Sequence, residues 1–108
     1  MFIIINDRGV YRFQSSQIVI GRSKSCDLIL DRASISDEQC KLTRDHAGVW
    51  WVSKLGPNPT LVNRSYIPAN RMTRVGPSDE ITVGEYMLQV RDSDRGGAVA
   101  RALRMTLF

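Results

Sequence analysis

Short apolar segments rich in β-branched and aromatic residues succeed one another along this chain, and turn residues end each of them within a few positions. The first ninety residues contain no stretch with the 3.6-residue spacing of an amphipathic helix. The expected strands are 2–5, 10–13, 18–20, 28–30, 40–42, 49–52, 61–62, 66–67, 80–83 and 86–90. We therefore predict an all-β fold, an antiparallel β-sandwich of about ten to eleven strands.

The 108 residues suffice for one domain with its own core. We place the sandwich at residues 1–92 and a basic tail at residues 93–108. Gly96 and Gly97 interrupt the last strand pattern, and residues 98–105 are compatible with a short helix or with a linker to a following segment. A membrane would be reached only through such a following segment.

The cysteine pattern and the N-terminus indicate a reducing compartment. No apolar run reaches the length of a membrane span, and residues 1–5 lead straight into a turn rather than into a signal peptide. Cys26 and Cys40 form no CxxC pair, so we expect two free thiols. The expected location is intracellular: the cytoplasm, or the nucleus in a eukaryote.

The net charge of +4 comes from 15 basic and 11 acidic residues, without any run of consecutive basic residues. Residues 1–90 carry a net charge of +2, and the 18 residues from Arg91 onward carry the other +2. Nucleic acid as the main partner is disfavoured, because phosphate-tracking surfaces need clustered charge. Binding of nucleic acid or lipid by a basic surface is kept as the alternative from another class.

Catalysis is not expected. His46 is the only histidine and lies in a turn signal, no serine or cysteine has an evident base, and metal-ligand spacings are absent. We expect neither a cofactor nor a metal.

An arginine at the lip of an apolar strand is the first candidate binding group. Gly21 ends the strand 18–20 and Arg22 follows it. A guanidinium in that place can bind a phosphate or carboxylate through two parallel hydrogen bonds. It can equally form an internal ion pair with Asp27, Asp31 or Asp37, and both readings stay open.

Several motifs, in order, resemble those of the forkhead-associated (FHA) family over residues 1–92. They are Gly21-Arg22, Cys26–Leu30, Ile35-Ser36, the Trp-rich segment 49–54, Leu55, Asn58, Thr60, Val62-Asn63 and Glu80–Gly84. The resemblance implies an eleven-stranded sandwich whose loops at one end bind phosphothreonine peptides. Thr43–Ala47 also looks like the family's serine motif, but only Ser36 leaves room for two strands before Asn58.

The resemblance implies roles for individual residues. Arg22 would bind the phosphate, the Ser36 hydroxyl would donate to a phosphate oxygen, and Asn58 would hold the peptide backbone. Thr60 and Asn63 would brace the loop and the hairpin that follows it. Gly21 and Gly84 would supply backbone freedom.

The sequence departs from the family pattern in two places. Asp37 stands where the family has arginine or asparagine after the serine, and Gln39 stands for the structural histidine, whose hydrogen bonds it can donate. Pro59 replaces the glycine after Asn58, fixes φ and pushes Asn58 towards an extended conformation. Lys24 and Ser34 are expected to compensate in part as loop donors.

These departures predict a protein–protein interaction module with an FHA fold that acts as a scaffold, with a degenerate site that is weakened or independent of phosphate. The alternative within the same class is phosphothreonine-peptide binding through Arg22, Ser36 and Asn58. The expected partner is a protein, with or without phosphothreonine, and a second copy of the chain is among the candidates.

Overall fold

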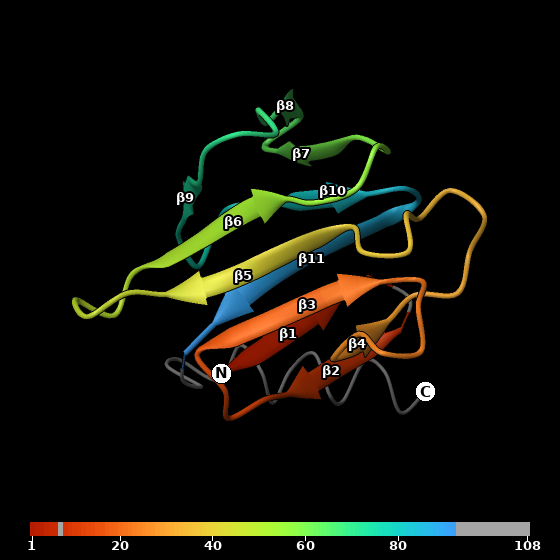
Figure 1. Cartoon of the computed structure of the whole chain (residues 1–108). Helices are drawn as coiled ribbons and strands as arrows, with labels where there is room; N and C mark the ends of the chain where they lie inside the picture. Colours follow the sequence, from red (N-terminus) through yellow and green to blue (C-terminus); the bar gives the residue numbers. More distant parts are fainter. Residues whose placement is uncertain (7, 93–108) are drawn as a thin grey trace.

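A computed structural model describes residues 1–6 and 8–92 and contains two β-sheets packed face to face (Figure 1). The strands are β1 (Phe2–Ile5), β2 (Gly9–Arg12), β3 (Gln17–Gly21), β4 (Leu28–Ile29), β5 (Cys40–Arg44), β6 (Trp50–Lys54), β7 (Thr60–Val62), β8 (Ser65–Tyr66), β9 (Thr73–Val75), β10 (Ile81–Val83) and β11 (Tyr86–Arg91). The all-β sandwich expected from the sequence is confirmed. The tail expected at residues 93–108 lies outside the described residues.

The two sheets have the orders β2-β1-β11-β10-β7-β8 and β4-β3-β5-β6-β9. Two features differ from the expectation. The pair β3–β4 is parallel rather than antiparallel, with Ile20 opposite Leu28. The strand β9 was not predicted, because in Thr73-Arg74-Val75 only the last residue is apolar and buried.

Apolar side chains that alternate along the central strands fill the space between the sheets. The pattern is clearest in β1, where Ile3 and Ile5 are buried and their neighbours less so, and in β11, where Leu88 and Val90 are buried. Trp50 faces this core with 5% of its surface exposed, whereas the following Trp51 turns outward and donates from Nε1 to Asp45. The core fixes the strand ends from which the loops emerge.

Five connections emerge at one end of the sandwich, on the right in Figure 1. They are the β1–β2 turn, the β3–β4 loop, the β4–β5 loop, the β6–β7 loop and the β10–β11 turn. The turn between β5 and β6 lies at the opposite end. Residues far apart in sequence therefore meet at the first end, which we call the loop end.

Both cysteines are buried free thiols, and burial raises the pKa of Cys40 to about 12. Within residues 1–6 and 8–92, no helix has the length and apolarity to cross a bilayer.

Candidate functional site

The β3–β4 and β4–β5 loops are joined by backbone hydrogen bonds at the lip of β3. The Arg22 N–H donates to the Ser36 carbonyl and the Ser23 N–H to the Asp37 carbonyl, both at 3.0 Å. A Cβ at Gly21 would collide with the Asp37 carbonyl oxygen. The backbone conformation of Gly21 is not left-handed, so this glycine permits a close approach rather than the freedom expected of it.

Gln39 lies at the centre of the loop end and has no exposed surface. Its Oε1 accepts from the Ser36 N–H at 2.8 Å. Its Nε2 lies 3.1 Å from the Asn58 carbonyl, 3.0 Å from that of Pro59 and 2.9 Å from Thr60 Oγ1. One side-chain amide therefore joins the β4–β5 loop to the β6–β7 loop.

Ser36 and Asn58 form a second link between the same two loops. Ser36 is 7% exposed, and its Oγ accepts from the Asn58 N–H at 3.0 Å. The Asn58 Nδ2 donates to the Ser34 carbonyl at 2.9 Å. The amide expected to hold a peptide backbone is thus bonded to the domain's own backbone, next to the proline that restrains Asn58.

Gly56 also positions these loops, and the sequence analysis did not single it out. A Cβ at this position would collide with the Ser36 side chain and the Glu38 carbonyl oxygen. The only sequence signal was its place in the turn Gly56–Pro59. Gly56 therefore lets the β6–β7 loop approach Ser36 closely.

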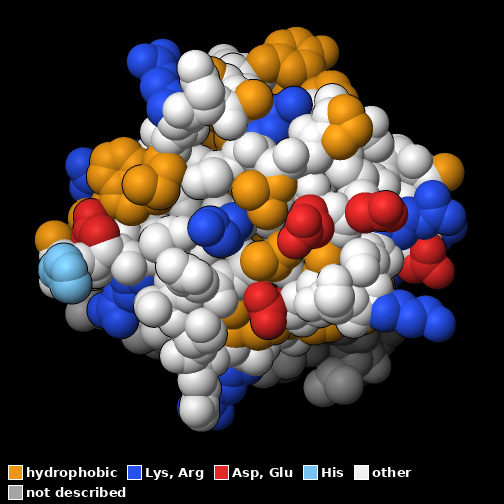
Figure 2. All heavy atoms as spheres, in the orientation of Figure 1, with side chains coloured by type: hydrophobic (Ala, Val, Ile, Leu, Met, Phe, Trp, Pro, Cys, Tyr) orange, Lys and Arg blue, Asp and Glu red, His pale blue; other side chains and the backbone are white. Residues whose placement is uncertain are grey.

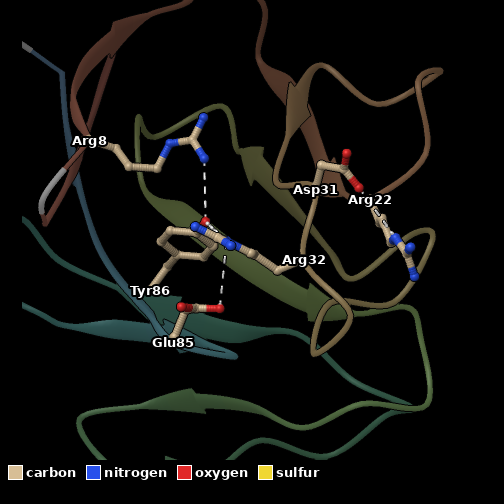
Figure 3. Close-up of polar contacts among 6 residues, drawn as sticks. All are labelled: Arg8, Arg22, Asp31, Arg32, Glu85 and Tyr86. Atoms are coloured by element: carbon tan, nitrogen blue, oxygen red, sulfur yellow. Dashed lines mark hydrogen bonds and ion pairs between the residues drawn. The ribbon is translucent and has the colours of Figure 1, made fainter.

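Arg22 lies at the rim of the loop end, with 49% of its side chain exposed. Its Nε contacts Asp31 Oδ1 at 3.4 Å, and the Asp31 side chain is 82% exposed (Figure 3). Of the three carboxylates weighed as internal partners, the structure thus pairs Arg22 with Asp31. An ion pair this exposed contributes about 0–1 kcal/mol, so it restrains Arg22 weakly.

Other predicted residues surround this centre. Lys24 and Asp37 are exposed, Pro59 is exposed while its carbonyl faces Gln39, and Thr60 is fully buried. Between the β4–β5 and β6–β7 loops lies an open groove, lined by Ile35, Ser36, Asp37, Glu38, Leu55, Gly56, Pro57 and Asn58.

Asn63 and Gly84 shape neighbouring turns. Asn63 has a left-handed conformation with φ of 50°, and its side chain bonds Asp79 and the Glu80 N–H at 3.0 Å each. It thereby ties the β7–β8 hairpin to the segment that enters β10. Gly84 has φ of 56°, as the freedom expected of this glycine requires.

The second serine-like motif, Thr43–Ala47, lies away from the loop end. Thr43 and Arg44 belong to β5, and Asp45 and His46 to the turn at the opposite end. Ser36 is the residue beside Arg22.

Charged side chains are interspersed on the face drawn in Figure 2, where basic groups alternate with acidic ones. This face offers no continuous basic area of the kind that tracks nucleic-acid phosphates.

The loops bring an exposed arginine, a hydroxyl and an open groove together at one end of a rigid sandwich, the arrangement typical of a binding module. The chain belongs to the FHA family: the model described as "FHA domain" matches residues 18–84. As an FHA domain it is a non-catalytic protein–protein interaction module. A comparison with curated proteins finds no match.

Solved structures share the fold at low sequence identity. The N-terminal FHA domain of Rad53 from S. cerevisiae, solved with a phosphothreonine peptide, is 17% identical with a TM-score of 0.74, over 84% of this chain and 93% of that one. The FHA domain of CT664 from Chlamydia trachomatis is 15% identical with a TM-score of 0.75, over 85% and 96%. The structure of Rad53 1–466 in complex with AMP-PNP is 17% identical to this chain with a TM-score of 0.74. The match covers 84% of this chain but only 30% of that longer chain.

Proposed function

We propose that this domain binds a protein segment carrying phosphothreonine, through Arg22 and Ser36, at a site that Asp37 and the engagement of Asn58 weaken. The observation that carries the proposal is the half-exposed Arg22 side chain, whose Nε meets one exposed carboxylate at 3.4 Å. A phosphate with nearly two charges and three acceptor oxygens competes well against that single carboxylate.

The Ser36 hydroxyl supports the same reading. Its oxygen accepts from the Asn58 N–H, while a hydroxyl keeps one proton to donate. A backbone hydrogen bond from the Arg22 N–H to the Ser36 carbonyl holds the two residues side by side. A phosphate at the rim would therefore meet a guanidinium and a hydroxyl donor together.

Two features weaken the proposed site. The Asp37 carboxylate is exposed beside Ser36, and its negative charge opposes that of a phosphate. The Asn58 amide donates to the Ser34 carbonyl and must leave it to bind a peptide. A loop braced by Pro59 and by Gln39 opposes that rearrangement.

Calorimetric titration with a degenerate phosphothreonine peptide pool and the same pool without phosphate tests the proposal. We expect binding of the phosphorylated pool alone, its loss in Arg22→Ala, and no change in the matched control Arg71→Ala, which removes another exposed arginine. Asp37→Asn should strengthen binding about fivefold, the equivalent of about 1 kcal/mol. Equal binding of the two pools, or of the phosphorylated pool by Arg22→Ala, would overturn the proposal.

Phosphate-independent assembly is the second candidate function. The Asp31–Arg22 ion pair and the internally bonded Asn58 favour it, since both groups already have partners. It predicts a concentration-dependent increase in mass by light scattering that phosphate does not alter and that Arg22→Ala leaves unchanged.

A further inference from the structure

A second pocket opens at the loop end, between the β1–β2 turn, the β4–β5 loop and the β10–β11 turn (Figure 3). Its lining residues are Asn6, Arg8, Tyr11, Arg32, Glu85 and Tyr86. None of them belongs to the candidate phosphothreonine site.

Two arginines from different loops converge on one phenol in this pocket. Arg8 Nη1 donates to the Tyr86 oxygen at 3.3 Å, and Arg32 Nε donates to the same oxygen at 3.2 Å. The Arg8 guanidinium also lies over the Tyr86 ring, 5.6 Å from its centre. Tyr86 itself is 6% exposed, so a buried residue fixes the position at which the arginines meet.

The two bonds to Tyr86 use only part of the donor capacity of these groups. With both acceptor positions of its oxygen occupied, the Tyr86 hydroxyl can only donate. Each guanidinium carries five N–H groups, of which the bond to Tyr86 uses one. An oxyanion in the pocket would therefore find two guanidinium groups and a phenol proton.

The charges in the pocket are not balanced among the described residues. Arg8 and Arg32 meet at a neutral oxygen, and Glu85 contacts Arg32 at 3.9 Å with both side chains about 60% exposed. The pKa of Tyr86 is lowered, chiefly by the hydrogen bond from Arg32, as expected in a positive environment. Bringing two like charges to one atom costs free energy, which a bound anion would offset.

The pocket adjoins the first site along the β4–β5 loop. Asp31 and Arg32 are consecutive, yet their side chains point in opposite directions, Asp31 towards Arg22 and Arg32 towards Tyr86 (Figure 3). A segment that lies across this loop would pass both sites.

We propose that Arg8, Arg32 and the Tyr86 hydroxyl form a second anion-binding site, which takes an acidic group, a carboxylate or a phosphate, of the protein segment that the domain binds. The inference extends the proposed function, since the acidic group belongs to that same segment. The domain therefore selects segments in which an acidic residue accompanies the phosphothreonine.

The test uses a set of phosphothreonine peptides. Some carry aspartate or phosphoserine before the phosphothreonine, others carry it after the phosphothreonine, and the reference peptide has alanine at these positions. On the favoured side, an acidic residue should strengthen binding about fivefold, as one or two partly exposed charge pairs allow. The double variant Arg8→Gln, Arg32→Gln should lose that preference and still bind the alanine peptide. Comparison of aspartate with phosphoserine distinguishes the two sources of the anion.

Arg71→Gln is the matched control, and circular dichroism checks the fold of each variant. The inference is overturned if the double variant keeps the acidic preference, or if wild type has none while Arg22-dependent binding persists. If phosphate dependence fails but acidic peptides without phosphate still bind through Arg8 and Arg32, the second site stands without the first. NMR provides an independent readout. Addition of inorganic phosphate should change the chemical shifts of Arg8, Arg32 and Tyr86, and these changes should persist in Arg22→Ala.

Discussion

The loop end contains two layers that are held in very different ways. In the lower layer Gln39 is fully buried, and its side-chain amide contacts four polar groups in the β4–β5 loop, the β6–β7 loop and the first residue of β7. In the upper layer Arg22 is half exposed and meets one carboxylate at 3.4 Å. The side chain that sets the loop geometry is thus held by several partners at once. Arg22, the group proposed to touch a ligand, can instead exchange its one partner for another.

Replacing Gln39 should have the largest effect on stability. Gln39→Met keeps the approximate volume but leaves buried groups such as the Ser36 N–H and Thr60 Oγ1 without this partner. We expect a loss of about 3 kcal/mol in the free energy of unfolding by urea. The control Gln17→Met, at an exposed position of β3, should stay within about 0.5 kcal/mol. Equal losses for the two variants would show that the lower layer is not what fixes the loops.

Gly56→Ala should rank second. Its Cβ would collide with Ser36 and with the Glu38 carbonyl, and relief requires the loops to separate. We expect a loss of about 2 kcal/mol on urea unfolding, with weaker binding of phosphopeptide. At Gly76 the nearest atom to an added Cβ is Asp79 Oδ2 at an ordinary 3.5 Å, so Gly76→Ala is the matched control and should change little. A Gly56→Ala domain of unchanged stability would contradict this account of the close approach.

Low pH should weaken the contribution of the β5–β6 turn to stability, because this turn contains a titrating carboxylate. It should not act on the Gln39 side-chain amide, which carries no titrating group. The pKa of Asp45 is lowered by the hydrogen bonds from Trp51 Nε1 and the Val49 N–H, so its contribution to stability is present above about pH 4 and is lost as pH falls through the folded-state pKa. Urea midpoints of the wild type should therefore decrease below pH 4. In Asp45→Asn that decrease should be smaller, and parallel decreases would argue against a role for Asp45.

The smallest effect on stability is expected at the rim. Asp31→Asn removes an exposed ion pair, so the free energy of unfolding should change by less than about 0.5 kcal/mol. Phosphopeptide affinity should instead rise about threefold, because Arg22 loses its competing carboxylate. A titration in which Asp31→Asn weakens binding would mean that Asp31 orients Arg22 for the ligand rather than competing with it.

Much of the fold could be read from the sequence, because alternation and turn residues mark ten of the strands. The strand β9 was not predicted because its pairing with β6, rather than an apolar pattern of its own, makes it a strand. The parallel orientation of β4 beside β3 was not predicted, because tertiary packing sets the relative direction of neighbouring strands. At the site, residue types indicated Arg22, Ser36 and the donor role of Gln39, but the steric need for Gly21 and Gly56 appears only when the loops meet. The convergence of Arg8 and Arg32 could not be predicted either, because the two residues are 24 positions apart and meet only at Tyr86 of β11.

The four outer strands of the two sheets are short. The edges are formed by β4 and β8 with two residues each, β9 with three and β2 with four. An incoming extended chain would find few unpaired backbone groups along β4 or β8, so growth of either sheet by strand addition gains little there. The recognition proposed for the loop end would therefore meet little competition from open-ended polymerisation at those two edges.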